Sequence, residues 1–242
     1  MSGHSKWANI KHKKAKMDAQ KGKLYTKLSK MIIVAVREGG PDPETNSKLR
    51  DIIEKAKEAN MPNENIMRAI KRGSGELGGA NLEEALYEGY GPGGAAILLE
   101  VMTDNRNRTA AELRHIFDKY GGNLGEAGCV AWMFEKKGLL IVEKNEETNA
   151  EDIMMLAIEA GSDDVEEQED SIEIVTSPEK FESVKEALLE NNVRLSSGEI
   201  TYIPKTTLTL SGKDSEMMDK LLEALDDHDD VQNVYTNYES AE

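Results

Sequence analysis

Hydrophobic residues recur at three- and four-residue steps between Lys21 and Glu38, which is the spacing of one face of an α-helix. A Gly-Gly-Pro sequence follows and predicts the end of that helix. The same spacing predicts a second helix, and then a third that has Pro62 in its first turn and Gly73 as its C-cap. Three short amphipathic helices joined by tight loops predict a small bundle over residues 21–76.

A glycine-rich linker, GSGELGGAN, separates this bundle from a region with strand-like patterns. In that region a polar loop, Thr103–Thr109, leads into an amphipathic helix that ends at a Gly-Gly pair. Short hydrophobic runs predict the strands Leu86–Tyr90, Ala95–Met102, Cys129–Phe134 and Leu139–Val142.

The next part of the chain is very acidic: residues 143–190 hold 17 acidic residues and three lysines. Its hydrophobic pattern nevertheless continues to alternate between strand and helix. Across residues 131–205 the predicted order is strand, helix, strand, strand, helix, strand, which is the split βαβ plan of ferredoxin-like domains.

The last segment predicts a strand, a helix and a strand. These three elements by themselves cannot form a sheet with a hydrophobic core. Residues 77–130 lack partners in the same way, so we expect them to form one domain with residues 206–242. The predicted fold class is α+β, with three domains. They are an N-terminal three-helix bundle with a basic arm at 1–20, and two α/β ferredoxin-like domains, one interrupted by the other.

The first 30 residues are strongly basic, although the whole chain has a net charge of −16. They contain nine lysines and one acidic residue, a net charge of +8. The arm has no apolar face, so we expect it to be disordered alone. Lysines neutralise phosphates, and tryptophan and histidine stack on bases. The candidate nucleic-acid-binding residues here are His4, Lys6, Trp7, Lys11, His12, Lys13, Lys14, Lys16, Lys21 and Lys23. The alternative is a solvated tail without a partner.

Two other basic regions have open interpretations. The polar loop contains Arg106 and Arg108, which suit phosphate contacts at a helix N-terminus. Alternatively its asparagines and threonines only cap that helix, although capping does not explain two arginines there. On the predicted bundle, the outward basic residues either support the arm or form an ordinary solvated face. They are Arg50, Lys55, Lys57, Arg68, Lys71 and Arg72.

Several function classes find no support in the sequence. The single cysteine, Cys129, excludes an internal disulfide and fits a reducing cytoplasm. The scattered histidines predict no zinc site, and the glycine-rich stretch Gly121–Gly128 matches no phosphate-binding or dinucleotide fingerprint. We find no catalytic motif, so we expect no enzyme activity, cofactor or metal. The chain has no membrane-span pattern, and its acidic faces favour a monomer.

Long motifs in this chain resemble the YebC/PmpR family. They include GHSKWANIKHKKAKMDAQKGKLYTKL, REGGPDPETNSKLRDIIEKAKEANMP, YEGYGPGG, TDNRNRTAAELRHIF and GGNLGEAGCVAWMF. The resemblance implies a helical domain followed by two α/β domains, and no catalytic residues. Members are described as DNA-binding transcriptional regulators, and also as ribosome-associated factors that help translation of proline-rich stretches. The mitochondrial relative is a translational activator of cytochrome c oxidase subunit I.

The charge distribution favours the ribosomal interpretation. A DNA reader is expected to present a basic helix to the major groove, whereas the positive charge here is concentrated in a flexible arm. Such an arm can thread into folded RNA and order on binding. We therefore expect a cytoplasmic translation factor whose arm contacts ribosomal RNA or tRNA. The alternative is a transcriptional regulator that binds promoter DNA.

Overall fold

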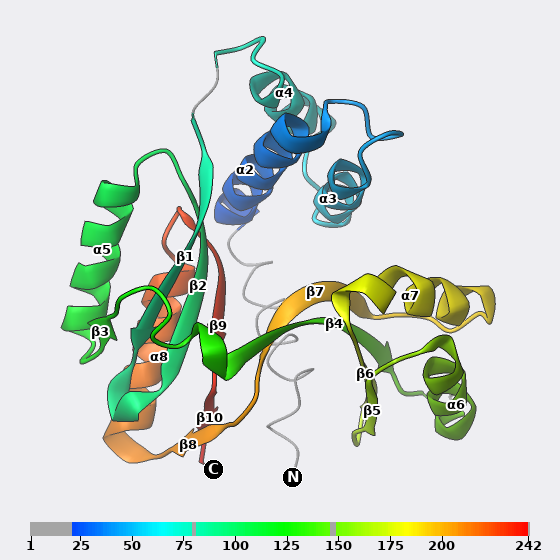
Figure 1. Ribbon diagram of the computed structural model, residues 1–242. Coiled ribbons are helices and arrows are strands. Elements are labelled where there is room, and N and C mark those ends of the chain that lie inside the picture. The colour runs from blue at the N-terminus through cyan, green and yellow to red at the C-terminus, as the bar shows by residue number, and fades with distance from the viewer. Residues whose placement is uncertain (1–20, 79–80, 146–148, 242) are drawn as a thin grey trace. The chain divides into compact units, whose positions relative to one another are not determined.

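The computed structural model describes residues 21–78, 81–145 and 149–241 (Figure 1). The described residues fall into two compact units. Met133–Lys205 form one unit, and residues 21–132 with 206–241 form the other. In the described part of the chain, no helix is both long enough and apolar enough to cross a membrane.

The larger unit begins with three helices, as the hydrophobic spacing predicts. They are α2 (Lys21–Gly39), α3 (Ser47–Glu58) and α4 (Asn63–Gly73). Their apolar faces form one core that includes the fully buried Ile32, Leu49 and Ala56. The side chain of Asn46 caps α3 by accepting from the Leu49 backbone N–H, and its amide donates to the Ala35 carbonyl at 2.8 Å. This buried amide ties α3 to the last turns of α2.

The same unit contains a four-stranded antiparallel sheet of order β3-β1-β2-β9. Two helices, α5 and α8, pack their apolar faces on one side of this sheet (Figure 1). A short turn, η1 (Pro92–Gly94), joins β1 directly to β2. The element bounds are β1 (Glu83–Tyr90), β2 (Ala96–Thr103), α5 (Arg106–Lys119), β3 (Asn123–Leu124), α8 (Gly212–Asp226) and β9 (Val231–Thr236).

Strand β9 lies beside β2 although more than a hundred residues separate them in sequence. Ile97 pairs with Thr236, and Leu99 pairs with Val234. A small parallel pair, β8 (Leu208–Leu210) with β10 (Tyr238–Ser240), completes this part of the fold. The segments before and after the acidic domain therefore form one domain interrupted by the other, as the sequence predicts.

The smaller unit is the acidic domain, whose antiparallel sheet has the order β5-β6-β4-β7. Its chain order is strand, helix, strand, strand, helix, strand, so the ferredoxin-like plan is confirmed here. Helices α6 and α7 share one core with the sheet. The bounds are β4 (Phe134–Glu143), α6 (Ala150–Ala160), β5 (Asp164–Glu167), β6 (Ser171–Thr176), α7 (Phe181–Glu190) and β7 (Ser197–Pro204), with η3 (Pro178–Lys180) before α7.

One predicted strand is wrong. The prediction places a strand at Cys129–Phe134, whereas the structure has a strand, β4, that starts only at Phe134 and contains the predicted strand Leu139–Val142. A short turn, η2 (Ala131–Met133), precedes it. Within β4, Gly138 allows close packing. A Cβ there would lie 2.5 Å from Cδ2 of Phe181 and would also meet the Thr176 hydroxyl.

Candidate nucleic-acid interface

Most candidate residues of the arm lie outside the described residues. These are His4, Lys6, Trp7, Lys11, His12, Lys13, Lys14 and Lys16, and their contribution to nucleic-acid binding stays a prediction. The arm's described end is the first turn of α2. Lys21 is exposed there, and it forms no ion pair with another described residue.

Further along α2, the lysine side chains contact an acidic segment of the same unit. Lys23, Lys27 and Lys30 share one face of the helix, and their partners lie in the segment LDDHDDV, which runs from the end of α8 to the start of β9. The Nζ–carboxylate distances are 3.2 Å for Lys23 to Asp227, 3.2 Å for Lys27 to Asp226 and 2.6 Å for Lys30 to Asp230. These three lysines thus neutralise internal acids.

Asp230 is the central acid of this contact, and its side chain is buried. Lys30 donates to Oδ1, while the Arg108 guanidinium and the Thr109 hydroxyl lie 2.8 and 2.7 Å from Oδ2. Burial raises the pKa of Asp230, but the hydrogen bonds from Lys30, Arg108 and Thr109 outweigh it, so this pKa lies far below its ordinary value. The carboxylate therefore stays ionised and fixes α5 to the start of β9.

The polar loop is shorter than predicted, because α5 already begins at Arg106. Asn105 is its N-cap, and its Oδ1 accepts from the Arg108 backbone N–H at 3.0 Å. Both arginines have acidic partners: Arg106 Nε lies 2.8 Å from Glu83, and Arg108 Nη2 lies 3.0 Å from Asp104. Capping thus explains Asn105, and ion pairing explains how two arginines are accommodated at a helix N-terminus. Their contact with nucleic acid stays a prediction.

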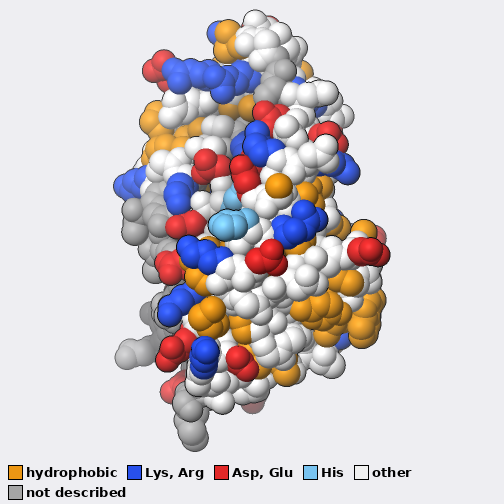
Figure 2. Space-filling view, turned by 90° about the vertical axis from the view of Figure 1, so that its left-hand side faces the viewer, with side chains coloured by type: hydrophobic (Ala, Val, Ile, Leu, Met, Phe, Trp, Pro, Cys, Tyr) orange, Lys and Arg blue, Asp and Glu red, His pale blue; other side chains and the backbone are white. Residues whose placement is uncertain are grey.

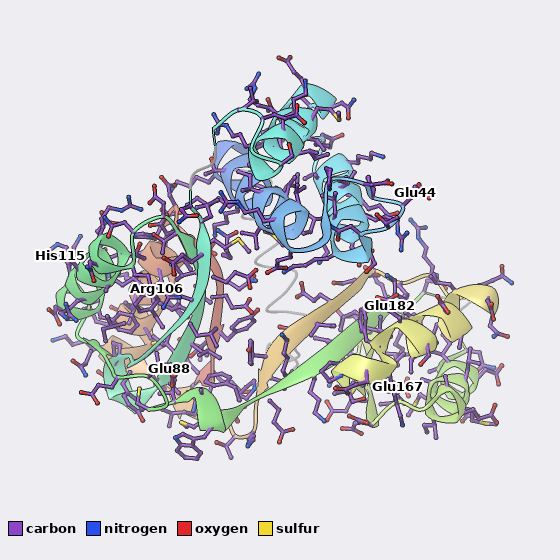
Figure 3. All side chains as sticks on the ribbon, turned by 45° about the horizontal axis from the view of Figure 1, so that its top comes forward. Glu44, Glu88, Arg106, His115, Glu167 and Glu182 are labelled. Atoms are coloured by element: carbon purple, nitrogen blue, oxygen red, sulfur yellow. The ribbon has the colours of Figure 1, made fainter. Side chains whose placement is uncertain are left out.

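Among the described residues, the surface around α5 carries charges of both signs (Figure 2). Figure 2 shows blue and red side chains alternating around a pale blue histidine on this face. Figure 3 shows Arg106 beside the sheet and His115 on the outer side of α5. An alternation of signs neutralises the field over this face, and a polyanion gains less attraction there than at the lysine-rich end of the chain.

The glycine-rich stretch after α5 has a structural role that sequence reasoning missed. Glu88, labelled in Figure 3, is buried on β1. Its carboxylate accepts hydrogen bonds from the backbone N–H groups of Gly128, Val130 and Ala131 at 2.6, 2.8 and 2.7 Å. Burial raises the pKa of Glu88, yet these three hydrogen bonds lower it more, so the pKa lies below its ordinary value. A single acidic position within a predicted strand gave no signal for this long-range contact.

Three side chains with metal-ligating atoms converge near α5. In the described part of the chain, Glu112, His228 and Asp230 bring one such atom each within 4.8 Å of one another. These atoms already have protein partners, however. The His228 ring donates from Nε2 to Glu112 at 2.9 Å and accepts the Asp230 backbone N–H at Nδ1. Since Asp230 also binds Lys30, the arrangement is a hydrogen-bonded network and does not indicate a metal centre.

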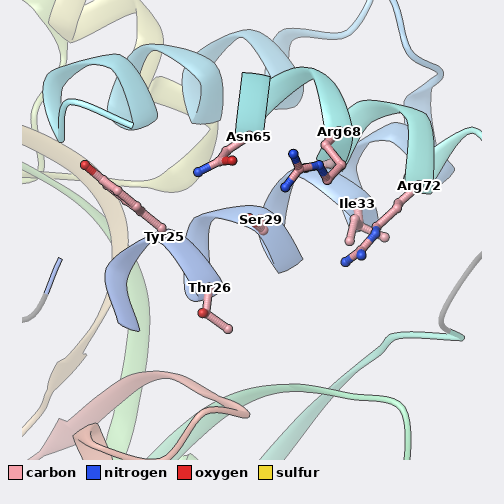
Figure 4. Close-up of a pocket in the computed structure, with 8 residues that line it drawn as sticks. Tyr25, Thr26, Ser29, Ile33, Asn65, Arg68 and Arg72 are labelled. Carbon is pink, nitrogen blue, oxygen red and sulfur yellow. The ribbon is translucent and has the colours of Figure 1, made fainter. Parts of the chain in front are cut away.

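A groove between α2 and α4 is a further site, with a volume of about 230 Å³. Figure 4 shows Arg68 and Arg72 of α4 on one side, and Thr26 and Ser29 of α2 on the other. Tyr25, Ile33, Asn65 and Ala69 complete the lining. The sequence analysis placed both arginines outside the bundle, but it could not indicate that they share a groove with α2.

Comparisons with known proteins agree with the motifs. Residues 5–76 match the family model of the TACO1/YebC protein N-terminal domain, and residues 82–238 match that of the TACO1/YebC second and third domain. A "probable transcriptional regulatory protein" of Pelotomaculum thermopropionicum is 60% identical over 240 residues, which are 99% of each chain. One of Thermoanaerobacter pseudethanolicus is 59% identical and covers 99% of this chain and 97% of its own.

A solved structure is also similar over nearly the whole chain. The crystal structure of a conserved hypothetical protein from Aquifex aeolicus has a TM-score of 0.86 and is 51% identical, with 98% of each chain covered. The resemblance drawn from the motifs is confirmed, and the chain belongs to the TACO1/YebC family.

Proposed function

We propose that this protein is a non-enzymatic, nucleic-acid-binding regulator of gene expression that acts on the ribosome. The single observation that carries this proposal is the charge distribution. The first 30 residues have a net charge of +8 in a chain whose net charge is −16. Such a separation directs one end of the protein toward a polyanion and repels the rest of the chain from it.

The internal ion pairs of α2 support the arm as the part of the protein that binds the polyanion. Lys23, Lys27 and Lys30 contact Asp227, Asp226 and Asp230, so their charges are largely neutralised within the protein. The lysines of the arm, together with the exposed Lys21, then supply the main attraction for phosphates. Trp7 and the two arm histidines add surfaces on which unpaired bases stack, a mode typical of single-stranded or folded RNA.

In the proposed mechanism the α/β domains dock on the ribosome, and the arm contacts ribosomal RNA or tRNA near the site of peptide-bond formation. An arm that orders on binding positions the substrates there and relieves stalling on proline-rich sequences. This role needs binding energy and positioning, and it needs no catalytic residue of the protein. It also places the protein in the cytoplasm.

The second candidate is a transcriptional regulator that binds promoter DNA. It is favoured by the names of the similar proteins, which are called probable transcriptional regulatory proteins. On duplex DNA the arm would supply salt-sensitive affinity with little selectivity. Selective binding of one promoter site at physiological salt would therefore support this second candidate over the first.

Co-sedimentation with purified ribosomes at physiological salt tests the proposal. The intact protein, a form lacking residues 2–20 and the variant Lys13→Gln/Lys14→Gln are compared, each with competing promoter-length duplex DNA. Lys213→Gln/Lys220→Gln is the matched control, because it removes two exposed lysines from α8. We expect the intact protein and the control to pellet with ribosomes, and the arm variants to bind more weakly.

A translation assay on a proline-rich message completes the test. The intact protein is expected to relieve stalling and the form lacking residues 2–20 to lose that effect. Equal activity of the two forms would contradict the role of the arm. Displacement from ribosomes by DNA, with retention on one defined sequence, would support the transcriptional candidate.

A further inference from the structure

The groove between α2 and α4 contains positive charge without any acid. Its eight lining residues include Arg68 and Arg72, and they include no aspartate or glutamate. Arg72 is exposed and forms no ion pair with another described residue. Arg68 lies 3.0 Å from Glu64, which is one turn away on α4, and an exposed pair of this kind is weak. The groove therefore attracts anions, in contrast to the ion-paired lysines on α2.

The groove also presents polar groups that the protein does not use. Within the described residues, the Ser29 hydroxyl and the Asn65 side-chain amide have no hydrogen-bond partner. Both line the same groove as the two arginines (Figure 4). A hydroxyl and an amide each offer a donor and an acceptor, whereas a guanidinium offers only donors. This combination suits a ligand that carries both an anionic group and a hydroxyl.

Close packing of the two helices holds these groups in place. Ala69 is buried, and Gly73 lies one turn further along α4. A Cβ on Gly73 would lie 2.7 Å from Cβ of Val36 and 3.0 Å from the Ile33 carbonyl oxygen. Small residues at these two positions let α4 approach α2 closely, so the arginines and Ser29 project from two elements packed against each other.

The volume of the groove indicates how much of a ligand enters it. At about 230 Å³ it is smaller than the roughly 300–1,000 Å³ of pockets that enclose a whole small molecule. A sugar and its phosphate fit such a space, while the remainder of a polymer extends beyond it. The groove also lies near the first described residue of the lysine-rich segment. Lys21 and Ser29 are eight residues apart on α2, or about 12 Å along the helix axis.

A larger groove adjoins this one and carries charges of both signs, because Lys23, Lys30 and Arg108 line it together with several acids. It shares Thr26, Ser29, Ile33 and Arg72 with the first groove, and it contains Asp104, Glu112 and the acids from Asp227 to Asp230. Two of these acids, Asp227 and Asp230, are paired with Lys23 and Lys30. A phosphate is therefore favoured at the α4 side, where Arg68 and Arg72 are the charged residues of the lining.

We propose that the α2–α4 groove binds one sugar–phosphate unit of the RNA that the arm engages. Arg72 and Arg68 contact the phosphate, and Ser29 and Asn65 bond to the ribose 2′-hydroxyl, the group that distinguishes RNA from DNA. The inference rests on the proposed function, because it assumes that RNA is the partner. It adds a second contact that would fix the direction of the RNA strand along α2.

Titrations of the full-length protein with ribosomal RNA, at several salt concentrations, test the inference. Arg72→Gln is compared with Lys71→Gln, which removes the same charge from the preceding residue of α4, also exposed and outside the groove. We expect Arg72→Gln to weaken binding roughly tenfold, the loss of one charge-assisted hydrogen bond. We also expect the slope of log affinity against log salt concentration to fall by about 0.7 in Arg72→Gln. Lys71→Gln should change the affinity and this slope less.

Ser29→Ala tests recognition of the ribose. It is expected to weaken binding of RNA and to leave binding of DNA of the same sequence unchanged, while thermal unfolding shows the same midpoint as for the unaltered protein. An equal loss on DNA would overturn ribose recognition. Displacement of the RNA by millimolar inorganic phosphate would instead identify a site for the free ion, and would also overturn the inference.

The outcomes separate the two proposals. If the unaltered protein binds ribosomal RNA and Arg72→Gln behaves like Lys71→Gln, the groove assignment fails and the proposed function stands. If the unaltered protein does not bind ribosomal RNA at physiological salt, both fail.

Discussion

The Nζ atom of Lys30 lies 2.6 Å from Oδ1 of Asp230, and this ion pair joins α2 to the residue that precedes β9. Both side chains are largely removed from solvent, with 16% and 7% of their surface exposed. Arg108 and Thr109 bind the other carboxylate oxygen, so one acid connects three separate parts of the chain. Removal of this acid is the first test of how the larger unit is held together.

We predict that Asp230→Ala lowers the free energy of unfolding by about 3 kcal/mol, because it leaves the largely buried Lys30 ammonium without its carboxylate partner. Urea denaturation of the purified protein measures this loss. Asp229→Ala is the control, since Asp229 is exposed and its side chain forms no ion pair with another described residue. Similar losses in the two variants would show that Asp230 contributes no more than an exposed acid.

Stability is also predicted to depend on pH through Asp230 and Glu88. Both carboxylates have a folded-state pKa below the ordinary value, because hydrogen bonds to the charged form outweigh burial. Their contribution is present above the unfolded pKa values of about 4, and it is lost as the pH falls toward the folded pKa values. Urea denaturation between about pH 6 and pH 3 should show a steady loss of stability. Asp230→Asn should lose less stability over this pH range. An unchanged slope of stability against pH in this variant would contradict the prediction.

Replacement of Glu88 should release the turn before β4. The amide of a Glu88→Gln side chain offers one neutral acceptor oxygen to the three backbone N–H groups of Gly128, Val130 and Ala131. We expect a loss of about 1–3 kcal/mol in the free energy of unfolding. Hydrogen exchange at these three amides should become faster. Glu126→Gln serves as the control, because Glu126 is an exposed acid in the same loop.

Gly138 should tolerate no side chain. An alanine Cβ there would lie 2.5 Å from Cδ2 of Phe181, inside the packed interior of the acidic domain. Gly138→Ala is expected to reduce stability by about 1–3 kcal/mol through overpacking. Gly22→Ala is the matched substitution, since its Cβ would meet nothing within 4 Å. Thermal unfolding of the two variants compares them directly, and equal midpoints would argue against steric crowding at Gly138.

The sequence predicted the elements whose hydrophobic spacing is regular. The bundle of α2, α3 and α4 follows from apolar residues at helical steps, and the acidic domain follows from its order of strands and helices. The pairing of β9 with β2 followed from a simple physical requirement, because neither segment could bury a sheet face alone. Local pattern and the need to form a core were sufficient for this much of the fold.

Features that depend on contacts between distant residues could not be predicted from the local sequence pattern. The sequence could not show that Gly138 lies against Phe181. It could not show that Glu88 binds the loop after β3, or that Arg108 binds Asp230. The α2–α4 groove was missed for the same reason, since it exists only once Ala69 and Gly73 allow the two helices to pack closely.

The pairing of β2 with β9 also sets the order in which the domains fold during synthesis of the chain. Strand β2 ends at Thr103, whereas β9 begins at Val231, after the whole acidic domain. At the usual elongation rate, roughly ten seconds pass between the two. The acidic domain has all its strands by Pro204 and can fold on the nascent chain, while the interrupted domain keeps an unpaired strand edge until translation is nearly complete. Premature termination between Pro204 and Val231 would therefore release a chain with one finished domain and one exposed edge.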